Sequence, residues 1–188
     1  MKRLLAIIDY QNDFVSGSLG FPGAEQLDLG ISELAQKYLA QGDPILITYD
    51  THDTDYLETR EGKALPVPHC ISKTDGWQLY GKTQDCIAGT CASNQIFPIS
   101  KTTFGIAPED LVQLKAQLGA IDEILIAGLV SNICVMANVC TLQAAWPAAQ
   151  IIVDASLCAS FDPALHEKTL DVMTGMQVKV IHRDQTAN

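Results

Sequence analysis

Four short apolar runs constrain the fold of this chain more than any other feature. They occupy residues 4–8, 44–48, 123–127 and 150–153, and none of them alternates between apolar and polar side chains. A strand with one face in water would alternate, so these strands are predicted to be buried on both faces, as in a parallel sheet covered by helices. A last short strand is predicted at residues 177–181.

Helical patterns separate these strands. Apolar side chains recur at helical spacing over residues 27–40 and 108–118, and Asp162 and Pro163 suit the start of a helix that runs to about residue 176. Alternating strands and helices imply right-handed crossovers and a three-layer α/β/α sandwich with a mainly parallel central sheet. The 188 residues are predicted to form a single domain, 1–188. Residues 51–103 lack a pattern, so that stretch is either functional or contains unrecognised elements.

Composition excludes several classes of partner. The chain has 12 Lys and Arg against 22 Asp and Glu, a net charge of −10, whereas binding to nucleic-acid phosphates needs clustered basic residues. The first apolar run is too short for a signal sequence or a membrane span. The six cysteines include no C-x-x-C pair. We therefore expect a cytoplasmic protein in a reducing compartment, with no nucleic-acid and no membrane partner.

Polar residues follow the first two strands, at the edge where α/β sandwiches bind their ligands. Asp9 ends the first strand, and its carboxylate is predicted to face the ligand crevice, although an aspartate there more often only caps a loop. Asp50 and His52 end the second strand, on the same side of an extended chain. They can share a divalent metal, for which His69, held by neighbouring prolines, is a third candidate ligand.

A thiol and an amine complete the set of candidate residues. Cys134 lies after the third strong strand, at or near a helix N-terminus, where backbone N–H groups are predicted to lower a thiol pKa and could stabilise an oxyanion. The alternative is a buried cysteine that acts as a small apolar residue, which is the commoner role. Lys101 follows a short strand-like run at 97–100, so its amine is predicted to be partly enclosed beside a carboxylate.

With these places marked, the sequence resembles the isochorismatase-like cysteine hydrolases, and among them it is most similar to nicotinamidases. The matching segments occur in the family order over nearly the whole chain: IDYQNDF at 8–14, DTH at 50–52, PHC at 68–70, KT at 101–102, GLVSNICV at 128–135 and DASLCAS at 154–160. The resemblance implies the isochorismatase-like hydrolase fold and a catalytic triad of Asp9, Lys101 and Cys134.

The resemblance also implies a mechanism. Asp9 would take the thiol proton, Lys101 would balance charge, and Cys134 would form a thioester as nicotinamide and water become nicotinate and ammonia. A non-proline cis peptide is expected before the nucleophile, at Val130–Ser131, turning the amides of Ile133 and Cys134 toward an oxyanion.

For the metal, the resemblance implies that Asp50, His52 and His69 hold an ion that binds the pyridine nitrogen and positions the ring against Phe14. Zinc is expected, with iron or manganese as alternatives. Some nicotinamidases have a further histidine six residues after the first. This chain has Glu58 there, which we take as the fourth ligand, with Glu61 as the alternative.

Other departures from the family leave the substrate open. Pro66 stands where several nicotinamidases carry an aromatic ring, and Ser131 and Asn132 replace a more usual Thr-Asp or Thr-Glu. Hydrolysis of another small amide or carbamoyl compound is the alternative function, and a non-catalytic binding protein on the same fold is a third. Hydrolysis of isochorismate ranks low, because family members with that activity lack the nucleophilic cysteine. A homo-oligomer is expected by resemblance.

Overall fold

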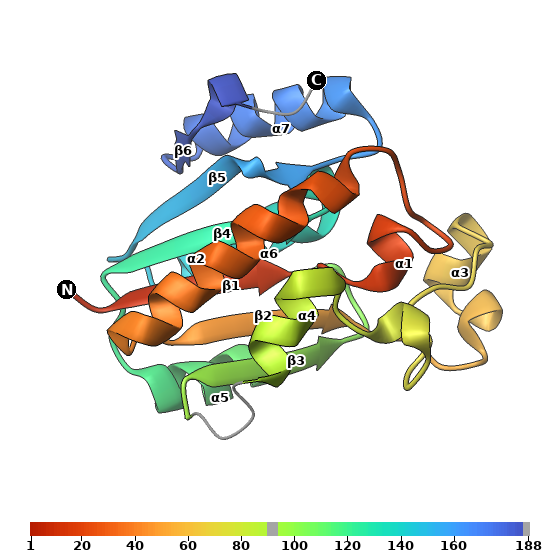
Figure 1. The fold of residues 1–188 in the computed structure, drawn as a ribbon, viewed down its shortest axis with the longest axis horizontal. Coiled ribbons are helices and arrows are strands. Elements are labelled where there is room, and N and C mark those ends of the chain that lie inside the picture. Colours follow the sequence, from red (N-terminus) through yellow and green to blue (C-terminus); the bar gives the residue numbers. More distant parts are fainter. Residues whose placement is uncertain (90–93, 186–188) are drawn as a thin grey trace.

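A computed structural model describes residues 1–89 and 94–185. They form a six-stranded parallel sheet with helices packed against it (Figure 1). The strand order is β3-β2-β1-β4-β5-β6, and every neighbouring pair is parallel. The predicted α/β architecture with a parallel central sheet is therefore confirmed. The strands are β1 Arg3–Ile8, β2 Ile45–Asp50, β3 Ile96–Lys101, β4 Glu123–Leu129, β5 Gln150–Ala159 and β6 Lys179–Ile181.

Helices cover both faces of the sheet (Figure 1). The α-helices are α1 Asn12–Val15, α2 Leu27–Gln41, α3 Arg60–Ala64, α4 Gly81–Ala88, α5 Pro108–Leu118, α6 Met136–Ala145 and α7 Pro163–Gly175. A π-helical turn, Ser131–Val135, leads directly into α6. Short 3-10 segments occupy Ala24–Gln26, Tyr56–Glu58, Asp75–Trp77 and Arg183–Gln185.

The core consists of two apolar layers, one on each side of the sheet. Leu5 and Ile7 of β1 pack with residues of α2 and α4, whereas Leu4, Ala6 and Ile8 pack with residues of α5, α6 and α7. Successive side chains of a strand point to opposite faces, so a strand covered on both sides must be apolar throughout. This requirement explains the unbroken apolar runs in the sequence.

The patternless stretch 51–103 contains elements that the sequence pattern does not reveal. Helices α3 and α4 are only five and eight residues long, too short to display a clear helical period. Strand β3 lies at the edge of the sheet, is only partly buried and contains Pro98, which edge strands tolerate.

Two predictions from composition can be compared with the structure. Within the described residues, no helix is long and apolar enough to cross a membrane. Cys70, Cys134, Cys140 and Cys158 are free thiols, while Cys91 lies outside the described residues.

Candidate active site

The sheet topology brings four candidate residues to one edge. Lys101 is the last residue of β3 and lies opposite Asp50, the last residue of β2, in the parallel register. Asp9 directly follows β1, and Cys134 lies in the turn that follows β4. Since β3, β2, β1 and β4 are successive neighbours, residues separated by up to 125 positions in sequence meet at their carboxyl ends.

Lys101 is the centre of a buried polar cluster. Its Nζ lies 2.6 Å from Asp9 Oδ2, 3.6 Å from Asp50 Oδ1 and 3.8 Å from Cys134 Sγ. All four side chains are buried. The Thr48 hydroxyl donates to Asp9 Oδ1 over 2.6 Å and so fixes the carboxylate from its other side. The structure thus gives the enclosed amine the carboxylate partner that its burial requires.

A close approach of two strand ends holds this cluster together. Asp9 adopts a left-handed backbone conformation with φ 45°, which is uncommon for a residue other than glycine. Gly128 in β4 has φ 125°, and a Cβ there would lie 2.1 Å from the carbonyl oxygen of Ile8. Only glycine permits this approach, which places the end of β1 directly beside the strand that leads to Cys134.

Electrostatics leave the resting thiol protonated. Burial, followed by the charge of Asp9, raises the pKa of Cys134 well above its usual value. The helix N-terminus is predicted to lower the thiol pKa, whereas in this structure burial and Asp9 raise it. Burial also raises the pKa of Asp9, against the opposing effect of Lys101. The thiol needs a base, and Lys101 joins it to the nearby carboxylate of Asp9.

The turn that carries the nucleophile differs from the expectation in two details. The cis peptide joins Leu129 and Val130, one position before the predicted Val130–Ser131. Without a proline, sequence contains no local signal for such a bond. The Ile133 amide donates to the Val130 carbonyl oxygen over 3.1 Å, so it closes the turn instead of pointing to a ligand as predicted.

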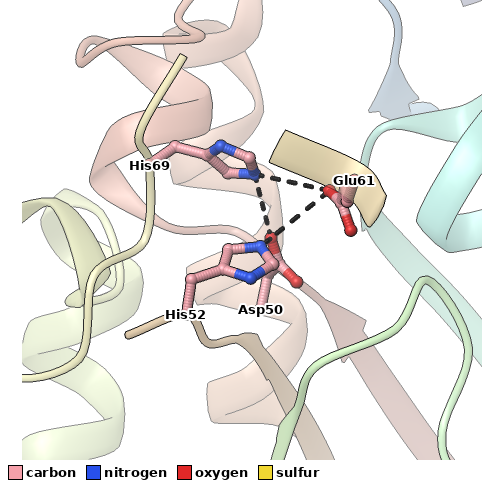
Figure 2. Close-up of side chains that lie close together, drawn as sticks. All are labelled: Asp50, His52, Glu61 and His69. Atoms are coloured by element: carbon pink, nitrogen blue, oxygen red, sulfur yellow. Dashed lines mark hydrogen bonds and ion pairs between the residues drawn. The ribbon is translucent and has the colours of Figure 1, made fainter. Parts of the chain in front are cut away.

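A second cluster, of potential metal ligands, shares Asp50 with the first. Figure 2 shows its four side chains. The Nε2 atoms of His52 and His69 lie 3.1 and 3.3 Å from Asp50 Oδ2, and each lies 3.9 Å from Glu61 Oε1. The fourth member is thus Glu61, and the choice of Glu58 was wrong. Glu58 is exposed in a 3-10 turn, whereas Glu61 stands one turn further on, at the start of α3.

The chemistry and spacing of this cluster fit a divalent metal. Ligands of a tetrahedral zinc at about 2.0–2.2 Å are separated by roughly 3.3–3.6 Å, close to the spacings of these donor atoms. His69 Nδ1 lies 2.8 Å from the Val67 carbonyl oxygen, which holds a proton on that nitrogen and leaves Nε2 free to ligate. Although burial opposes its ionisation, hydrogen bonds from His52 and His69 keep the pKa of Asp50 below its usual range.

Gln11, which the sequence interpretation did not select, braces a metal ligand. Its side-chain Nε2 donates to the carbonyl oxygens of Asp50 (3.0 Å) and Trp77 (2.8 Å), and its Oε1 accepts from the Asp50 amide (2.8 Å). The side chain is fully buried. The only sequence signal was its place two residues after Asp9, inside the IDYQNDF segment.

We predict that Gln11→Met weakens zinc binding about 10- to 100-fold, which is typical when a residue that supports a metal ligand is lost. The backbone amide and carbonyl of Asp50 would both lose their hydrogen bonds to the Gln11 side chain. Competition with a chromophoric chelator measures the affinity. Gln113→Met, on the exposed surface of α5, is the control and should bind zinc normally. Equal zinc affinities for Gln11→Met and the wild type would contradict the bracing role.

The departures Ser131 and Asn132 both have partners near the start of α7. Ser131 Oγ lies 2.9 Å from His166 Nδ1, and Asn132 Oδ1 accepts from the Ser160 hydroxyl over 2.7 Å. These contacts fix the first residues of the turn that carries Cys134. They link the nucleophile to a helix that the sequence interpretation assigned no role.

His166 gives a prediction for stability against pH. Its pKa is lowered, chiefly by burial, so the unfolded chain binds its proton at higher pH than the folded chain. The stabilisation from neutral His166 is therefore present above its unfolded pKa of about 6.5 and is lost as pH falls below it. We expect His166→Gln to cost about 1 kcal/mol at pH ~8 and to flatten the fall toward pH ~5. Urea unfolding at both pH values measures the unfolding free energy. An equal fall of this free energy toward low pH in His166→Gln and the wild type would contradict the prediction. The control is His182→Gln, at a half-exposed histidine.

Both clusters open into one cavity of about 590 Å³. Cys134 lies in its wall together with the metal-cluster residues Asp50, Glu61 and His69. Phe14 also lines it, with its ring centroid 5.5 Å from that of His69 in an edge-on arrangement. The remaining lining residues are Ser18, Leu19, Gly20, Ala64, Leu65, Phe104, Val130, Ile133 and Phe161.

A buried cysteine beside a carboxylate and an amine, at the carboxyl edge of a parallel sheet, defines the class of α/β cysteine hydrolases. A model of the Isochorismatase domain matches residues 3–185, and the chain belongs to this family.

Solved and curated relatives agree with this assignment. The crystal structure of a nicotinamidase/pyrazinamidase from Bacillus subtilis is 30% identical, with a TM-score of 0.86 and coverage of 96% of this chain and 99% of that one. A nicotinamidase of Saccharomyces cerevisiae is 23% identical over 97% of this chain and its own full length. A pyrazinamidase of Pyrococcus horikoshii, solved in complex with zinc, shares the fold at 20% identity and TM-score 0.80, covering 96% and 99% of the two chains.

Proposed function

We propose that the protein is a cysteine-dependent amidohydrolase that converts nicotinamide and water to nicotinate and ammonia. One observation carries the proposal: Cys134, Asp9 and Lys101 are in contact where the cavity also reaches a metal-competent cluster. The similarity to nicotinamidases supports the choice of substrate.

In the first half-reaction, Asp9 accepts the proton of Cys134 as the sulfur attacks the amide carbon. The raised pKa of Asp9 suits this task, because a carboxylate of ordinary acidity is a weak base toward a thiol. When the C–N bond breaks, the same proton passes to the nitrogen, which leaves as ammonia. Lys101 remains charged and offsets the negative charge that moves between Asp9 and the sulfur.

The second half-reaction hydrolyses the thioester. Asp9 takes a proton from the attacking water, the C–S bond breaks, and the proton returns to the sulfur as nicotinate leaves. The oxyanion in both steps lies at the N-terminal turn of the nucleophile helix, where unpaired backbone N–H groups favour negative charge. Of the predicted donors, we assign this role to the Cys134 amide, since that of Ile133 is engaged in the turn.

The metal cluster orients the ring. Asp50, His52, Glu61 and His69 would hold the ion, which we propose to be zinc, with iron or manganese as alternatives. When bound, it supplies a Lewis-acidic anchor for the pyridine nitrogen. Phe14 packs against one side of the ring, and the remaining apolar wall limits access of water.

Metal removal tests this account. We expect dialysis against a chelator to lower kcat/KM for nicotinamide about 100-fold or more, because the ring would lose its anchor, and zinc addition to restore it. Ammonia release measures the activity. Full activity in protein shown to be metal-free would contradict the anchoring role. No ammonia from the metal-loaded enzyme would overturn nicotinamide as the substrate and favour another small amide or carbamoyl compound.

We also propose that the protein acts in the cytoplasm as a homo-oligomer. The free thiols of Cys70, Cys134, Cys140 and Cys158 suit a reducing compartment, and the resemblance to the family supports self-association. Sedimentation as a monomer would contradict the second part.

A further inference from the structure

The side chains that line the cavity become more exposed from its floor to its mouth. At the floor, the exposed fraction is 4% for Cys134 and 7% for Phe14. At the mouth it is 38% for Leu65, 43% for Phe104 and 60% for Phe161. We call these three residues the apolar rim. They come from separate segments, after α3, β3 and β5, and all three line the cavity.

Other large apolar side chains are exposed elsewhere, such as Val112 and Val172, but among the described residues the exposed phenylalanines occur only at this opening. Of the five in the chain, only Phe104 and Phe161 are exposed, and both line the cavity. Phe161 is supported from behind by Phe21, with ring centroids 6.4 Å apart in an edge-on arrangement. Large apolar side chains grouped in the exposed mouth of a cavity are characteristic of a binding surface.

The cavity is also much larger than nicotinamide needs. That molecule has nine non-hydrogen atoms, and even at the ~30 Å³ that a water occupies in the liquid these would fill less than half of the 590 Å³. With the ring at the metal cluster and the carbonyl at Cys134, the unused volume lies toward the rim. Leu65, and not its neighbour Pro66, lines this part of the cavity, so no aromatic side chain closes it at that point.

We propose that the enzyme hydrolyses pyridine carboxamides that carry an apolar substituent on the ring, and that the apolar rim binds this substituent. The proposal rests on the proposed function and extends its range of substrates. The chemistry is unchanged: water cleaves the same primary amide bond, ammonia leaves, and the substituent stays on the acid product. Burial of each additional CH₂ group against the rim is favourable by roughly a fourfold gain in binding.

The test compares kcat/KM for nicotinamide with that for nicotinamides carrying a butyl group at different ring carbons, measured as ammonia release. We expect at least one butyl compound to match or exceed nicotinamide. Phe161→Ser and Phe104→Ser should each lower kcat/KM for that compound about five- to tenfold more than for nicotinamide, since less apolar surface would cover the butyl group. Val172→Ser, which removes an exposed apolar side chain of α7 outside the cavity, is the matched control and should change neither.

Three results would overturn the proposal. The first is that every butyl compound reacts at under a hundredth of the rate of nicotinamide. The second is that the rim substitutions affect both substrates equally. The third is that the rim substitutions dissociate an oligomer in sedimentation but leave the preference for butyl compounds unchanged. The rim would then be a contact between copies of the chain. Failure of the proposed function itself is distinguishable, because nicotinamide would then be inert with every variant.

Discussion

Replacing Cys134 with alanine is expected to lower kcat for nicotinamide hydrolysis about 10⁴-fold or more. Both half-reactions use its sulfur, first as the attacking atom and then as the leaving atom, and loss of a nucleophile removes both routes together. The substitution deletes one atom from a buried site and should leave the metal cluster intact. Ammonia release under saturating substrate measures the effect, with zinc affinity and thermal unfolding recorded for the same protein.

Cys158→Ala provides the matched control. Cys158 is equally buried but lies in β5, packed against the core, and does not line the cavity. Its substitution should cost some stability and little activity. Comparable activity in Cys134→Ala and Cys158→Ala would show that Cys134 is only a core residue and that the assigned chemistry is wrong.

Lys101→Met is expected to have the next largest effect, on both stability and activity. The Lys101 amine lies against two buried carboxylates, and methionine would leave the charge of Asp9 unpaired and would remove one partner of Asp50, which keeps His52 and His69. Removing one partner from a buried ion pair typically costs about 3–5 kcal/mol of unfolding free energy. We expect kcat to fall about 10²- to 10⁴-fold, the range typical for a lost proton-transfer group, because Asp9 would hold its proton more tightly.

The pH dependence separates this electrostatic effect from simple loss of structure. Lys101 lowers the pKa of Asp9, so removing it should raise that pKa further above the ordinary value of about 3.9. Activity requires ionised Asp9 and is lost as pH falls through this pKa, so the acid limb should move to higher pH in Lys101→Met. Metal content must be checked at each pH. An unmoved acid limb would contradict the role of Lys101, and exposed Lys115→Met is the control.

The spacing of apolar residues was enough to predict the parallel sheet and the helices on its two faces. Unbroken apolar runs such as 4–8 arise because alternate residues of β1 enter opposite core layers. Pattern failed where the element is short, as in the five-residue helix α3, whereas β3 at the sheet edge matches the strand-like run at 97–100. The structure of such short segments depends on contacts with residues far along the chain, and a local pattern of apolar residues does not reveal these contacts.

The site was predictable to the extent that it sits at strand ends. Asp9, Asp50 and Lys101 were found because each directly ends a strand, and parallel strands bring such residues together. Glu61 could not be distinguished from Glu58 by spacing, because the short turn between β2 and α3 decides which carboxylate faces the histidines. Gln11 was missed because its partners are backbone atoms of Asp50 and Trp77, far along the chain.

The most direct test of the central claim is mass spectrometry of enzyme acid-quenched during nicotinamide turnover and then digested. The account predicts that the peptide containing Cys134 gains the mass of one nicotinoyl group and that hydroxylamine, which cleaves thioesters, removes it. Two results would contradict the cysteine thioester mechanism. One is an active enzyme whose adduct lies on a residue other than Cys134, and the other is a variant without Cys134 that releases ammonia at the same rate as the wild type.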